Sequence, residues 1–144
     1  MSRYAYTTFC DDIRYEVNGK VSLMGTFGGV LFIPVAPALI PKLCCIISVH
    51  SDLDDPISDL RVTGSFLGQT IFTSEVDDAG LKEMYAAAPA VENRKGFTAQ
   101  LMIALAPFSM ESYGKIDIEI LVDGEKLDCA GLQISKAPEG MILS

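Results

Sequence analysis

The sequence has no tryptophan and only one histidine, His50, among its 144 residues. A catalytic triad or a metal centre built on several histidines is therefore excluded. Aromatic residues make up only 8% of the chain, which gives little support to a platform for stacking sugars. The GxSxG, HExxH and GxGxxG signatures are also missing. These absences argue against most enzyme classes, and we expect no activity and no cofactor.

Basic residues are few, since 11 Lys and Arg stand against 19 Asp and Glu and give a net charge of −8. An acidic surface repels phosphate groups, so we expect no binding to nucleic acids or to anionic membranes. A long apolar run is absent too. The most apolar stretch, residues 27–49, is interrupted by three prolines and Lys42, so it does not predict a membrane span.

The four cysteines form no CxxC pair. Cys44 and Cys45 are adjacent, whereas Cys10 and Cys129 lie in other expected strands. This pattern favours small buried residues in a reducing compartment, with a Cys10–Cys129 disulfide or a metal site as the alternative. Residues 1–4 lead directly into strand-like sequence, so we expect no signal peptide and a cytoplasmic protein.

Three tight turns are what the sequence does contain. Asp123-Gly124 predicts a two-residue hairpin with the pairs Val122–Glu125, Ile120–Leu127 and Ile118–Cys129. At Asn18-Gly19 a two-residue turn would set an apolar face against a polar one. A three-residue loop repairs this, and we expect a type I turn with a glycine bulge and the pairs Tyr15–Val21 and Ile13–Leu23. Gly68 marks the third turn.

The pattern of turns and alternation predicts one domain over residues 1–135, followed by a tail at 136–144. Within the domain we expect an antiparallel β-sandwich of seven or eight strands with one short helix, and a β-barrel is the alternative. The helix is expected at 78–88, capped by Asp77 or Asp78 and ended by Pro89. The strands are expected at 6–17, 20–27, 43–50, 58–67, 69–77, 97–106, 114–122 and 125–135.

Two groups of aspartates are candidates for function. Asp52, Asp54 and Asp55 share one loop, and such a loop can supply the oxygen ligands that calcium prefers, although a solvated turn is the commoner explanation of this pattern. Asp11 and Asp12 interrupt a strand-like run, where aspartate is uncommon. Alternation places Asp11 on the expected core face. We therefore expect it to cap a kink in the backbone, unless the strand begins only at Asp12.

The segment 33–41 is apolar and rich in proline, so it is no central strand and is expected to cross between sheets. If it lies on the surface, it forms an apolar patch for a protein partner. The candidate residues for this contact are Val35, Ala36, Leu39 and Ile40.

Residues 9–14 (FCDDIR) and 19–25 (GKVSLMG), followed by a proline-rich link into 41–43 (PKL), resemble the opening of small uncharacterised proteins in bacterial and phage genomes. The resemblance covers residues 9–47. It implies no activity and gives no residue a role. Its implication is a context, that of a phage or prophage accessory protein that blocks host machinery.

The leading hypothesis is therefore a non-enzymatic module that binds another protein or a second copy of itself. The second is a β-sandwich that binds calcium or a small ligand through the loop at 52–55. An enzyme that uses carboxylates alone ranks last, because the sequence places no two of them across a cleft.

Overall fold

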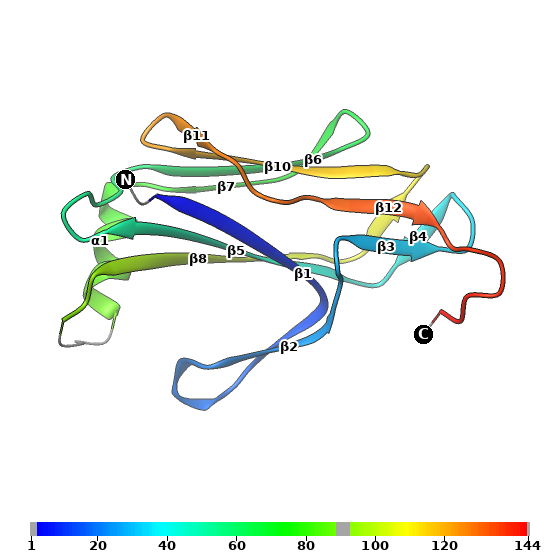
Figure 1. Ribbon diagram of the computed structural model, residues 1–144, viewed down its shortest axis with the longest axis horizontal. Helices are drawn as coiled ribbons and strands as arrows, with labels where there is room; N and C mark the ends of the chain where they lie inside the picture. Colours follow the sequence, from blue (N-terminus) through cyan, green and yellow to red (C-terminus); the bar gives the residue numbers. More distant parts are fainter. Residues whose placement is uncertain (1–2, 89–92, 144) are drawn as a thin grey trace.

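Two open β-sheets face each other across an apolar core (Figure 1). The computed structural model describes residues 3–88 and 93–143, which form twelve strands in three sheets and one short α-helix. The prediction of a mainly antiparallel β-sandwich with one helix is confirmed. The expected number of seven or eight strands is too low, because short strands such as those at Val30–Ile33, Ala38–Ile40 and Phe108–Met110 were not predicted. The barrel alternative is wrong, because each large sheet ends in two edge strands instead of closing on itself.

The first large sheet, sheet A, is entirely antiparallel, with the strand order β2-β1-β5-β8. Its strands are β1 (Tyr4–Tyr15), β2 (Val21–Thr26), β5 (Leu43–Asp52) and β8 (Gly96–Leu105). The second, sheet B, has the order β3-β12-β10-β6-β7, and its β3–β12 pair is parallel. Its strands are β3 (Val30–Ile33), β6 (Leu60–Phe66), β7 (Gln69–Val76), β10 (Gly114–Val122) and β12 (Leu132–Lys136), while β11 (Glu125–Leu127) pairs with β10.

The core follows from alternation along the central strands. In β5 the side chains of Leu43, Cys45, Ile47 and Val49 point inward, and in β10 those of Ile116, Ile118, Ile120 and Val122 do the same. All eight are buried. Because successive side chains of a strand alternate between faces, the residues between them form the outer faces of the sandwich.

The turns at 123–124 and 67–68 are confirmed. Both residues of each turn have positive φ, as a type I′ hairpin requires, and the pairs Val122–Glu125 and Ile120–Leu127 are present. The pair Ile118–Cys129 is not in the ladder, because β11 ends at Leu127 and β12 begins only at Leu132. The single strand expected at 125–135 is therefore two strands, which pair with different parts of β10.

The first hairpin has the predicted register, with Tyr15 opposite Val21 and Ile13 opposite Leu23. Its turn, a 3₁₀ turn at Val17–Gly19, is not the predicted type I. Asn18 has φ 63° as well as Gly19 at 74°, whereas a type I turn needs negative φ at both central positions. Asparagine is one of the few residues that adopts this conformation readily.

This hairpin projects from the sandwich as an arm, residues 11–26 (Figure 1). β1 pairs with β5 only as far as Cys10, and beyond that point it pairs with β2 alone. The prediction that Asp11 faces the core is therefore wrong, and Asp11 is exposed. Its carboxylate packs against Gly25, which has φ +65° and where any Cβ would collide with it. The alternative of a strand beginning at Asp12 is also wrong, because β1 begins at Tyr4.

The apolar segment 33–41 leaves β3 at the edge of sheet B and leads to β5 in sheet A, so the expected crossover is confirmed. On the way, β4 (Ala38–Ile40) pairs with β9 (Phe108–Met110) in a small third sheet.

The helix α1 (Asp78–Ala87) is capped by Asp77, whose side chain accepts a hydrogen bond from the Gly80 N–H. Pro89 lies outside the described residues. In the described part of the chain, no helix is long and apolar enough to cross a membrane.

Candidate functional site

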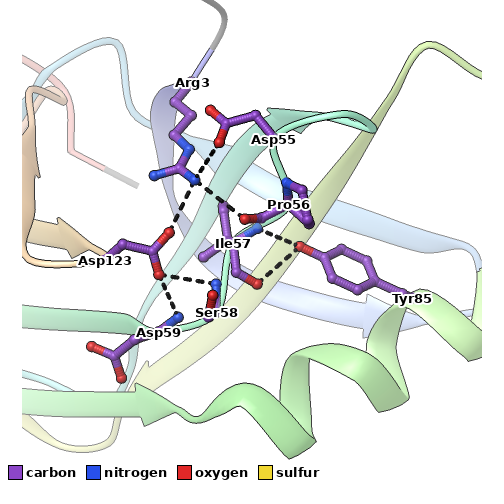
Figure 2. A network of polar contacts seen from close by, with 8 residues as sticks. All are labelled: Arg3, Asp55, Pro56, Ile57, Ser58, Asp59, Tyr85 and Asp123. Carbon is purple, nitrogen blue, oxygen red and sulfur yellow. Dashed lines mark hydrogen bonds and ion pairs between the residues drawn. The ribbon is translucent and has the colours of Figure 1, made fainter.

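The aspartate-rich loop after β5 is tied to the rest of the fold by Arg3 (Figure 2). The Arg3 guanidinium lies 3.0 Å from the carboxylates of both Asp55 and Asp123. The second oxygen of Asp123 accepts hydrogen bonds from the backbone N–H groups of Ser58 and Asp59, at 2.9 and 2.8 Å. These contacts join the start of β1, the loop and the β10–β11 turn, so the role that they indicate is structural.

Tyr85 of α1 extends the same network (Figure 2). Its hydroxyl accepts a hydrogen bond from the Ile57 N–H at 2.9 Å and donates one to the Ile57 carbonyl at 3.3 Å. Its ring packs edge-on against Phe97, with centroids 4.2 Å apart. Sequence reasoning did not predict these contacts of Arg3 and Tyr85, because their partners lie far away along the chain.

The three predicted calcium ligands have separate surroundings. Asp52 ends β5 opposite Gly96, Asp54 is exposed in the loop, and Asp55 is paired with Arg3. Within residues 3–88 and 93–143, no group of three or more His, Cys, Asp or Glu side chains is arranged to hold a metal. Calcium binding stays a prediction, and the arrangement of the loop adds no support to it.

The predicted partner residues lie beside an apolar groove of about 730 Å³. Leu39 and Ile40 line it together, while Val35 and Ala36 lie outside the lining. Leu39 is 65% exposed. The opposite walls come from β3 and from the tail residues Ile142 and Leu143. The structure therefore brings two of the four predicted contact residues into one apolar surface.

A second surface, which the sequence reasoning missed, is the outer face of sheet A. Four rows of residues run across β1, β5 and β8 on this side, in the registers that the ladders give. The rows are Tyr4-His50-Thr98, Tyr6-Ser48-Gln100, Thr8-Ile46-Met102 and Cys10-Cys44-Ala104. None of these twelve positions, which we call the neutral face, carries Asp, Glu, Lys or Arg.

The polar groups of the neutral face contact one another along the rows. The ring of His50 stacks on Tyr4 with centroids 4.8 Å apart, and its Nδ1 lies 3.2 Å from the Thr98 hydroxyl. Gln100 donates a hydrogen bond of 3.4 Å to Ser48. Tyr4 and Tyr6 are 53% and 50% exposed. The result is a hydrogen-bonded sheet surface with exposed aromatic rings.

Charges lie beyond the ends of the neutral face. Asp52 follows its last row on β5. At the opposite end Lys42 forms an ion pair of 3.0 Å with Asp12, and its ammonium group lowers the pKa of that carboxyl by hydrogen bonding. The sequence did contain a signal for this surface. Residues 43–51 and 96–105 are each free of Asp, Glu, Lys and Arg, whereas residues 114–122 alternate apolar and charged positions.

The four cysteines are free thiols, so the Cys10–Cys129 disulfide is not formed. Burial raises the pKa of Cys45 to about 12 and that of Cys129 to about 11. Burial also raises the pKa values of Cys10 and Cys44. Because the thiolate is the reactive form, none of the four has the low pKa of a catalytic nucleophile.

Comparison with protein families gives one match. A family of unknown function, DUF6941, matches residues 5–135. The chain belongs to this family. The DUF6941 match takes in almost all of both large sheets, and it ends within β12. No curated protein sequence matches the chain. The family description adds no activity, so a function is inferred below from the surfaces of the molecule.

Proposed function

We propose that this DUF6941 chain is a non-enzymatic module that binds another protein through the neutral face of sheet A. The observation that carries the proposal is the absence of charge from twelve neighbouring outward positions in a chain with 30 charged residues. Cys10, Cys44, Ile46 and Ser48 are buried among their neighbours, and the other eight positions reach the surface without a charge. A sheet face in contact with water normally alternates apolar inward residues with polar and charged outward ones. The centres of protein interfaces, in contrast, are depleted in charge.

The aromatic residues on this face support the same role. Tyr4 and Tyr6 lie on the same side of β1, with ring centroids 6.4 Å apart. Tyrosine is enriched among the residues that contribute most to binding energy, because it buries a large rigid ring and keeps a hydroxyl for hydrogen bonding. The face extends across three neighbouring strands, so its size suits a folded partner.

The groove beside β4 is a second candidate surface. The exposure of Leu39 and the apolar lining from β3 and the tail favour an apolar segment of a partner there. The two surfaces are separate patches, one on the face of sheet A and one beside β3 and β4, so one experiment can distinguish between them.

A photo-crosslinking amino acid placed at Gln100, Leu39 or Glu119 tests the proposal in the cells that naturally make the protein. Glu119, on the outer face of sheet B, is the control position. We expect one partner to be captured from Gln100, and not from Glu119. Adding Tyr6→Glu should abolish the capture while the melting temperature stays close to that of the parent. Capture from Leu39 alone, or equally from all three positions, would contradict the neutral face as the binding surface.

A further inference from the structure

β8 is an edge strand of sheet A. β8 pairs with β5 through ten consecutive residues, from Gly96 to Leu105, and it is the last strand in the order of the sheet. A strand in this position presents a row of unpaired backbone N–H and C=O groups along its outer side. Such an edge can add a further strand, and natural proteins usually protect it with charges, proline, bulges or short length.

β8 has no charge, proline, bulge or short length to protect it, and helix α1 lies beside its first half only. Each of the other three end strands in the two strand orders has at least one of the four features. The ten residues of β8 include no charge and no proline, and its ladder with β5 has no irregularity. At the edge of sheet B, β7 carries Glu75 and its ladder is shifted between Gly64 and Ser65. The opposite edge, β3, has only four residues. β2 is also short, and Gly25 interrupts it with a left-handed conformation.

We propose that β8 pairs with the β8 of a second copy of this chain, antiparallel and about a two-fold axis. Two identical strands related by such an axis run antiparallel. In such a pair, a charged residue of β8 would lie near its own copy and the two like charges would repel. β8 has no charged residue, so this repulsion is absent. The rest of the surface opposes self-association, since each copy carries a net charge of −8.

The alternation of faces restricts the register of this pair. Residues that are directly opposite must point to the same side, so one residue of β8 lies opposite its own copy and the axis passes midway between the two. The two registers with the greatest overlap place Gln100 opposite its own copy or Leu101 opposite its own copy. In either one, the two Gln100 side chains are direct or diagonal neighbours.

The structure has room for the second strand. An open gap of about 490 Å³ runs beside the first half of β8, and it is lined by Arg94, by Gly96–Gln100 and by the helix residues Met84, Ala87 and Ala88. Apart from Arg94, these uncharged side chains would flank an incoming strand. Pairing at β8 would also extend sheet A from four strands to eight and join the two neutral faces into one surface. The dimer does not depend on the partner proposed above.

Sedimentation velocity of the purified full chain at micromolar concentrations tests this inference. We expect the parent protein to sediment at twice the monomer mass of 15.5 kDa. Gln100→Lys and Gln100→Glu should each raise the dissociation constant at least about tenfold, because like charges then face each other in the joined sheet. An equimolar mixture of the two variants should restore the dimer, which also shows that both are folded. Gln69→Lys, on the edge strand β7, is the matched control and should leave the dimer intact.

Three results would overturn the inference: a monomeric parent protein, a Gln100→Lys variant that dimerises like the parent, or a mixture that stays monomeric. The crosslinking experiment reports on a different protein, because an adduct with a second copy has its own mass. A dimer without a captured partner would remove the proposed function and keep this inference. A captured partner with a monomeric chain would do the reverse.

Discussion

The two sheets of the sandwich have similar inner faces and opposite outer faces. Both inner faces are rows of buried aliphatic side chains. The outer face of sheet B is charged, and its charged residues are Arg61, Glu75, Lys115, Asp117, Glu119 and Lys126. Arg61 and Glu75 form an ion pair of 2.9 Å across neighbouring strands. The corresponding rows of sheet A have no charge at all.

The comparison of the two sheets distinguishes the residues that the core requires from the residues that only face outward. The core requires the alternation of apolar side chains in both sheets. On the neutral face the fold also buries Cys10, Cys44, Ile46 and Ser48, and their lack of charge follows from that burial. Sheet B shows that this sandwich tolerates a charged, solvated surface. At the exposed positions of the neutral face, such as Tyr4, Tyr6 and Gln100, packing requires no neutral side chain, and a protein interface is the explanation that we propose.

The comparison first requires that the two inner faces be equivalent. Ile47 of β5 and Ile120 of β10 are both completely buried. We expect Ile47→Ala and Ile120→Ala each to lower the free energy of unfolding by about 2–5 kcal/mol, because each removes the same groups and leaves a cavity. Urea denaturation followed by circular dichroism measures both. A loss well below this range in one variant would show that the sheets do not share one core.

The outer faces should respond differently to the same substitution. Ser48 lies in the neutral face and is 1% exposed, whereas Ser65 lies on sheet B opposite Asp117. Ser48→Lys should cost about 1–3 kcal/mol, because it forces a cation among buried neighbours. Ser65→Lys should change stability by less than about 0.5 kcal/mol, because the new ammonium group lies on a charged, solvated face. Equal losses in the two variants would remove the contrast between the faces.

The Arg3 network links sheet A to sheet B, and its two carboxylates are unequal. Asp123 also accepts two backbone N–H groups, so Asp123→Asn should cost about 1–2 kcal/mol while retaining a residue that tolerates φ 51°. Asp55 is more exposed, and Asp55→Asn should cost less than about 1 kcal/mol. Thermal melts of both variants compare their melting temperatures. A lower melting temperature for Asp55→Asn than for Asp123→Asn would contradict this account of the network.

The smallest effect is expected at the end of the neutral face. Lys42 lowers the pKa of Asp12 in the folded chain, so the pair stabilises the fold above the ordinary value of 3.8. That contribution disappears as the pH falls through the lowered pKa. Lys42→Gln should raise the pKa of Asp12 towards 3.8, as an NMR titration of the carboxyl carbon would show. An unchanged pKa would assign the shift to the Ile13 N–H, which also donates to Asp12.

The features that the sequence predicted correctly are local. The registers at 17–19 and 123–124 follow from the turn residues and the alternation beside them. The errors lie where distant segments meet. The strand expected at 125–135 is split, because its second part pairs with β3. The pairing of β1 with β5 ends at Cys10, and Asp11 therefore lies outside the sandwich. Arg3 and the neutral face also depend on strand order, which alternation alone does not determine.

The position of β12 has a consequence for synthesis of the protein. This strand lies between β3 and β10, and it pairs with a segment made about a hundred residues earlier. Until the ribosome has released residues 132–136, sheet B is divided, and β3 and β10 each keep an open edge. The core of this domain is therefore complete only after residues 132–136 have left the ribosome. Removal of β12 would leave β3 and β10 with unpaired backbone groups, so a chain truncated before residue 132 would aggregate.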